Sequence, residues 1–214
     1  MPPAGPEEEV SGDSLPAMTT PALDVRATLA RAAAAFHESG NRDALDAGLR
    51  AVVSAGDADA LIAAVEPFRD QPEIAGPIYE RVVALDPENA RALVILANAW
   101  WLTGRGPDVV GELASRAIAA DPANRGAWHL WALTEPSPRR RTARWEQVSA
   151  RFPEDDLARA SFADNATSLA GAESDPVALR QAIAAYEVLL ARAQHSDQRD
   201  SLEHALRTLR GWRL

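Results

Sequence analysis

From residue 22 onward, apolar residues recur at the three- and four-residue spacing of an amphipathic helix, and no stretch alternates as a strand does. Two stripes show the pattern clearly, one from Leu179 to Ala193 and one from Leu202 to Trp212. Turn-forming residues interrupt it at Gly40, Gly56, 71–72, 86–87, 104–107, 121–122, 136–138, Pro153, 174–176 and Ser196. The chain is therefore predicted to be all-α, with about eleven helices of roughly 11 to 18 residues whose sequential neighbours lie antiparallel.

One of these turns occurs twice. The stretch "ALDPENARALVILANAWW" begins at residue 84, and "AADPANRGAWHLWA" follows at the equivalent place from residue 119. The aligned pairs include Arg81 with Arg116, Asp86 with Asp121, Pro87 with Pro122, Asn89 with Asn124 and Ala92 with Ala127. An internal repeat of this length is typical of stacked helical hairpins, in which each unit buries its apolar face against the next.

The repeat resembles the tetratricopeptide repeat (TPR). The family's first-helix pattern is met by Leu93, Leu96, Ala97, Trp100 and Gly104, and its closing turn by the two Asp-Pro-x-Asn segments. The resemblance implies stacked antiparallel hairpins in a right-handed superhelix. It also implies that Gly104, as a small residue, lets the two helices of a hairpin approach closely.

The domain prediction divides the chain into three parts. Residues 1–21, rich in Pro and Glu, are expected to form a disordered tail. Residues 22–195 are read as a TPR-like domain of about five hairpins, some degenerate. Residues 197–214 are expected to form a C-terminal capping helix, because the last repeat of a solenoid has no neighbour to cover its apolar face.

The double tryptophan suggests a binding surface. Leu93, Leu96 and Trp100 share one helix face, so Trp100 is assigned to packing within the repeat, and Trp101 lies about 100° further round. In TPR proteins the first helices line a concave groove that holds peptides. By resemblance, the partner-binding residues here are Arg91, Val94, Asn98, Trp101, Leu102, His129 and Leu133. The alternative is that Trp101 packs in the core against the preceding hairpin.

Composition excludes several kinds of chemistry. All 22 basic residues are arginine and there is no cysteine, so a Schiff-base or P-loop lysine, a thiolate nucleophile and a cysteine metal site are excluded. His195 and His204 lack the spacing of metal ligands, and we expect no metal or cofactor. No secretory signal and no apolar run of about 18 residues is found, so we expect a cytoplasmic protein without membrane contact.

The net charge of −9 is uneven, with −10 on residues 1–89 and +1 on residues 90–214. An acidic surface disfavours nucleic-acid binding. Arg139, Arg140, Arg141 and Arg144 form a basic segment beside Trp145, which is either a solvated helix start or a contact for phosphate or nucleic acid. Arginines in a first turn oppose the helix dipole, which suggests a carboxylate partner from residues 154–156 or from the acidic first half of the same or a second copy.

Three functions remain open. The first is a noncatalytic scaffold or adaptor that binds a partner peptide or helix of unidentified origin in its concave groove. The second is a regulatory or assembly subunit that self-associates through the basic segment and the acidic first half of a neighbour. The third is a small helical enzyme that uses carboxylates and His129.

Overall fold

A computed structural model describes residues 23–213, and the tail predicted at residues 1–21 lies outside this range. Within it, every regular element is helical, which confirms the predicted all-α class. The helices are α1 (Val25–Ser39), α2 (Arg42–Ala55), α3 (Ala58–Val65), a short 3-10 turn η1 (Glu66–Phe68), α4 (Pro72–Leu85), α5 (Ala90–Leu102), α6 (Pro107–Ala120), α7 (Arg125–Leu133), α8 (Pro138–Arg151), α9 (Asp156–Glu173), α10 (Pro176–Arg192) and α11 (Ser196–Arg210). None of these helices is long and apolar enough to cross a membrane.

The repeated Asp-Pro-x-Asn segments are helix-starting turns. Asn89 accepts a hydrogen bond from the Ala92 N–H at 3.0 Å, and Asn124 accepts one from the Ala127 N–H at 3.2 Å. Each asparagine thereby satisfies an amide that has no partner within its own helix, which stabilises the helix by ~1 kcal/mol. The proline between the two polar residues cannot continue the preceding helix. This motif therefore marks the passage from one hairpin to the next.

Gly104 does not have the role predicted for it, and the close approach of two helices occurs at another glycine. A Cβ on Gly104 would meet nothing within 4 Å, so close helix approach does not explain this residue and that prediction is wrong. Gly104 instead has φ +76°, a left-handed conformation that allows the chain to leave α5. Close approach occurs at Gly48, where a Cβ would lie 2.3 Å from the Cβ of Ala32, so α1 and α2 pack nearly backbone to backbone.

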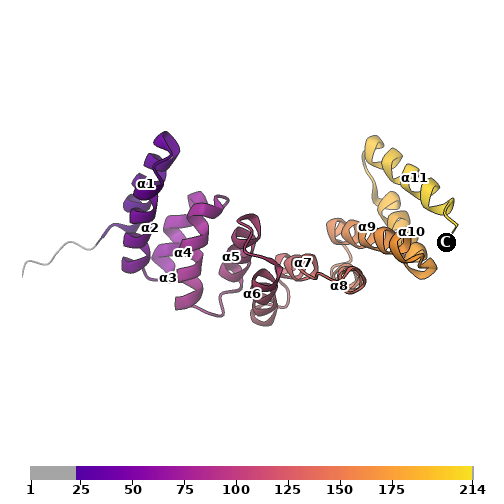
Figure 1. Ribbon diagram of the computed structural model, residues 1–214, viewed down its shortest axis with the longest axis horizontal. Coiled ribbons are helices and arrows are strands. Elements are labelled where there is room, and N and C mark those ends of the chain that lie inside the picture. The colour runs from indigo at the N-terminus through magenta and orange to yellow at the C-terminus, as the bar shows by residue number, and fades with distance from the viewer. Residues whose placement is uncertain (1–22, 214) are drawn as a thin grey trace, which may run out of the picture.

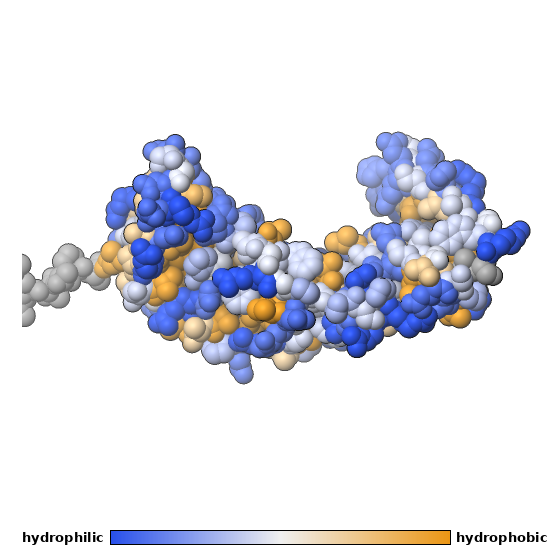
Figure 2. Space-filling view, in the orientation of Figure 1, coloured by the Kyte–Doolittle hydropathy of each residue, from blue (hydrophilic) through white to orange (hydrophobic). Residues whose placement is uncertain are grey.

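The hairpins α1–α2, α3–α4, α5–α6, α7–α8 and α9–α10 follow one another in a row that curves as an open arc (Figure 1). The arc rises at both ends, where α1 and α11 lie. Figure 2 shows the same outline in space-filling form, with hydrophobic side chains scattered among hydrophilic ones on this face. The structure is thus an all-α solenoid.

The core has two main parts that meet at α7. One part runs from α1 to α7 and has Tyr79 as its largest fully buried side chain; the other runs from α7 to α11 and includes Trp128 and Trp145. Trp131 packs against both parts. Trp100 is partly buried against the first part, in line with its assignment to packing within the repeat. The short helix α7 therefore connects the two halves of the arc.

The division into a repeat domain at 22–195 and a cap at 197–214 stays a prediction. In the structure α11 packs on α10, and its Leu206 and Leu209 are buried. Trp212, just beyond α11, packs against the buried residues of the second half.

Candidate peptide-binding groove

A cavity of about 470 Å³ opens between α5, α7, α8 and α9. Its walls come mainly from first helices of successive hairpins. The lining residues are Arg69 and Asp70, Val94, Ile95 and Asn98 of α5, Gly126, His129, Leu130 and Leu133 of α7, Trp145 of α8, and Leu157 and Ser161 of α9. We call this cavity the groove.

Four of the seven residues predicted for partner binding line the groove together. They are Val94 and Asn98 from one repeat and His129 and Leu133 from the next. Stacking of the hairpins has brought them together from positions up to 39 residues apart in the sequence.

The other three predicted residues lie outside the lining of the groove. Arg91 pairs with Glu66 at 3.0 Å, which occupies its guanidinium at the start of α5. Trp101 and Leu102 lie one turn beyond Asn98 on the same face of α5, and both are exposed. Trp101 is 37 % exposed and is therefore not a core residue. These two side chains extend the apolar surface from the groove to the end of the helix.

Part of the groove was not predicted from the sequence, above all Leu157, whose side chain is 64 % exposed. A signal for it existed: Leu157 follows the N-cap Asp155 by two residues, as Arg91 follows the N-cap Asn89. Extending the repeat alignment to α9 would have added Leu157 to the predicted groove residues. In the structure this repeat position lines the groove at Gly126 and Leu157, whereas Arg91 pairs with Glu66 outside it. Trp145 and Arg69 gave no such signal, because they come from a second helix and from a connecting segment.

Beside the groove, His129 is held by a buried carboxylate. Its Nε2 lies 2.7 Å from Oδ2 of Asp155, a residue that is only 6 % exposed. The ring also meets Trp145 edge-on, with 5.4 Å between the ring centroids. When Nε2 carries the proton donated to the carboxylate, Nδ1 of a neutral imidazole is an acceptor. His129 is thus a positioned polar group in a largely apolar groove.

Asp155 has several structural partners besides His129. Its Oδ1 accepts from the Ala158 N–H at 3.1 Å and so caps α9, and Arg125 Nε lies 3.5 Å from its Oδ2. Burial by itself raises the pKa of Asp155. The Ala158 and His129 hydrogen bonds and the Arg125 charge outweigh burial and hold that pKa below its usual value. The carboxylate is therefore ionised at neutral pH and ties α7 to α9.

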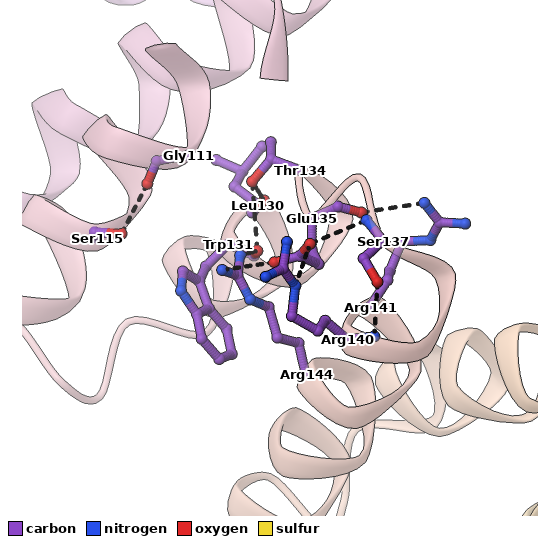
Figure 3. A network of polar contacts seen from close by, with 10 residues as sticks. All are labelled: Gly111, Ser115, Leu130, Trp131, Thr134, Glu135, Ser137, Arg140, Arg141 and Arg144. Carbon is purple, nitrogen blue, oxygen red and sulfur yellow. Dashed lines mark hydrogen bonds and ion pairs between the residues drawn. The ribbon is translucent and has the colours of Figure 1, made fainter. Parts of the chain in front are cut away.

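The basic segment at the start of α8 is neutralised within the chain (Figure 3). Its centre is Glu135, 4 % exposed, which accepts from the Ser137 N–H at 3.0 Å and from Arg140 Nε at 3.1 Å and pairs with Arg144 Nη2 at 3.0 Å. These donors, Ser137 first, hold the pKa of Glu135 below its usual range despite burial. Arg144 also lies 4.3 Å from the centroid of the Trp131 ring.

The remaining arginines of the segment also have partners. Arg139 pairs with Glu173 and Asp175, and Arg141 donates to Asn165 and to the carbonyl of Glu135. The expectation that residues 154–156 supply the carboxylate is wrong: Asp155 is engaged by His129 and Arg125, and its two neighbours pair with Arg192. A guanidinium reaches whichever carboxylate the stacking of helices places near it.

No protein-family model matches the sequence, and no curated protein matches it. Among solved structures, two of MamA are similar. One has a TM-score of 0.55 at 17% identity over 81% of this chain and 97% of that chain, and the other 0.56 at 18% identity over 73% and 98%. A thermophilic TPR protein from Thermus thermophilus gives a TM-score of 0.51 at 17% identity over 85% and 98%. These likenesses confirm that the chain has the TPR fold.

Proposed function

We propose that this chain, a solenoid of TPR fold, is a noncatalytic interaction module whose groove binds a peptide segment of another protein. The observation that carries the proposal is the shared cavity of Val94, Asn98, His129 and Leu133. The cytoplasmic location remains a prediction from the sequence.

The groove has the chemistry of a recognition surface. Leu133 is 40 % exposed and Leu157 64 %, so a ligand side chain placed between them removes apolar surface from water on both sides. Asn98 is exposed and makes no side-chain hydrogen bond to any residue of 23–213, so its amide is available to pair with a peptide backbone. His129 adds a second polar group. An apolar anchor flanked by backbone contacts is the ligand that this arrangement favours.

A noncatalytic role also agrees with the way the titratable groups are used. The Asp155 carboxylate already caps a helix, holds His129 and faces Arg125, so its interactions are structural. The enzyme alternative requires these groups to converge on a reacting atom, whereas the groove is open to solvent along α5 and α7.

Self-association through the basic segment is not favoured. Each of its four arginines is engaged by acceptors of its own chain, so a neighbour's acidic half would have to displace existing ion pairs. The arginine charges of the basic segment therefore do not favour association with the acidic half of a second copy.

A random peptide library displayed on phage tests the proposal directly on the full chain. We expect selected peptides to carry an apolar anchor and to bind about fivefold or more weakly to Leu157→Ala or Asn98→Ala, because a contact at the centre of an interface is worth more than about 1 kcal/mol. Val177→Ala is the matched control, since Val177 is an exposed apolar residue of α10 outside the groove. Peptides that bind all three variants as tightly as the parent chain would refute the groove assignment.

A further inference from the structure

A second cavity, of about 440 Å³, lies between α2 and α4, away from the groove. Both are second helices of their hairpins, whereas the groove is built mainly from first helices. The lining residues of each wall recur at the spacing i, i+3, i+4 and i+7, so each wall is one face of a helix. They are Asp46, Leu49, Arg50 and Val53 on α2 and Pro77, Glu80, Arg81 and Ala84 on α4. Each wall is therefore an apolar stripe flanked by charged side chains.

The two stripes lie at the same height along their helices. α2 and α4 pack side by side, and because they occupy the same place in successive hairpins they run in the same direction (Figure 1). Each stripe covers about two turns, or roughly 10 Å of helix. Val53 of α2 therefore lies level with Ala84 of α4, at one end of the cavity.

Two exposed charges of opposite sign border the cavity without forming an ion pair. Arg50 lies on the α2 wall and Glu80 on the α4 wall, and neither forms an ion pair with any residue of 23–213. The other two charged lining residues differ: Asp46 already pairs with Arg42 at 3.4 Å, and Arg81 is half-buried on its own helix. Arg50 and Glu80 are thus the exposed charges that this surface presents to a partner.

This pattern is complementary to itself. A two-fold axis parallel to the helices places α2 of one copy opposite α4 of a second copy, at the same height. Arg50 of each copy then faces Glu80 of the other, so the same contact forms twice. A two-fold axis across the helices would bring the two Arg50 side chains together, which repulsion disfavours. A partner with one sign of charge would leave either Arg50 or Glu80 without an ion pair. A second copy is therefore the occupant that the charges favour.

We propose that two copies of this chain associate through α2 and α4. The four helices form a bundle whose centre holds the apolar stripes, and the two Arg50–Glu80 ion pairs lie at its sides. Closure of the bundle removes the apolar lining of both cavities from water. Each stripe spans only about two turns, so the interface is small and we expect a dissociation constant of ~1–100 μM. The groove takes no part in this contact, so the dimer carries it twice, and the association does not depend on peptide binding.

Sedimentation velocity of the full chain, from ~1 μM to ~1 mM, tests the association. We expect a shift from monomer to dimer across this range, and a chain that stays monomeric throughout would overturn the proposal. Arg50→Glu and Glu80→Arg should each weaken the dimer about tenfold or more, because like charges then face each other at both contacts. The double variant should restore the dimer, because both ion pairs return with their charges exchanged.

Arg180→Glu is the matched control, since Arg180 is an exposed arginine of α10 outside the cavity. We expect it to dimerise like the parent chain. A double variant that is no stronger than the single variants would refute the contact between Arg50 and Glu80. Dimers that are equally stable in every variant would place the interface elsewhere and also overturn the proposal.

Thiol cross-linking tests the orientation, since the chain has no cysteine of its own. Val53→Cys and Ala84→Cys are made as separate chains, one of them isotope-labelled, and the mixture is treated with a short bis-maleimide. The proposed axis places position 53 of one copy opposite position 84 of the other, so mass spectrometry should find mixed pairs well above their share under random pairing. Val177→Cys mixed with Ala84→Cys is the control and should give no such excess, because Val177 lies on α10. Random pairing in the first mixture would contradict the proposed dimer.

Discussion

Asp155 offers the sharpest test of how the groove is held together. Asp155→Ala removes the cap of α9 and the acceptor of His129 in one change. Loss of an N-cap costs ~1 kcal/mol, and a partly buried donor left without an acceptor costs ~1–3 kcal/mol. The expected loss in free energy of unfolding is therefore ~2–4 kcal/mol.

The matched variant is Asp155→Asn. Asparagine caps helices as well as aspartate does, so the bond from the Ala158 N–H survives, while the charge facing His129 and Arg125 is lost. We expect a smaller loss in free energy of unfolding, about 1–2 kcal/mol, because a hydrogen bond to a charged group stabilises a protein more than a neutral one by about this amount.

Native-state hydrogen exchange is the suitable assay, because solenoids open by units and a single unfolding free energy is then poorly defined. We expect faster exchange in α9 and α7 of the alanine variant, with α1 and α2 unchanged. If both variants exchange like the parent in α9, the claim that Asp155 ties the two helices together is wrong.

The pH dependence follows from the same carboxylate. Because folding lowers the pKa of Asp155, its contribution to stability is complete above the unfolded value of about 3.9 and is lost as pH falls through the folded value. We expect the difference between the parent chain and Asp155→Asn to shrink as pH falls below about 4. A difference that grows below about pH 4 would contradict this sign.

Four further changes test the packing. Gly48→Ala should lower the free energy of unfolding by ~1–3 kcal/mol, because the added Cβ would collide with α1, and calorimetry should therefore show a lower thermal midpoint. An unchanged midpoint would show that the helices separate freely. Gly104→Ala should cost ~1 kcal/mol in the same assay through its positive φ alone, and Gly104→Asn less. Trp100→Ala should destabilise the chain far more than Trp101→Ala, since only the first indole packs against the core; equal losses in denaturant titrations would refute that assignment. Glu135→Gln should lower the thermal midpoint at neutral pH and have less effect below about pH 4, where the parent carboxyl is itself protonated; a pH-independent loss would show that its charge is immaterial.

The sequence alone determined the helices and their order. Helix periodicity and turn residues act within one or two turns of chain, so Asn89, Asn124 and the prolines beside them mark the hairpin boundaries wherever the rest of the molecule lies. The face shared by Val94 and Asn98 follows from the same local geometry. These interactions form between residues that are close in the sequence and do not depend on distant residues.

Only the tertiary structure decided which of these faces meet. Leu157 joins the groove, Trp101 lies beyond it, and Glu135 rather than residues 154–156 neutralises Arg140 and Arg144. Each outcome depends on the angle and offset between stacked hairpins, which set where a long side chain ends relative to residues far away in sequence. The role of Gly104 likewise depends on the backbone conformation at the end of α5, because a small residue is compatible with either close packing or a left-handed turn.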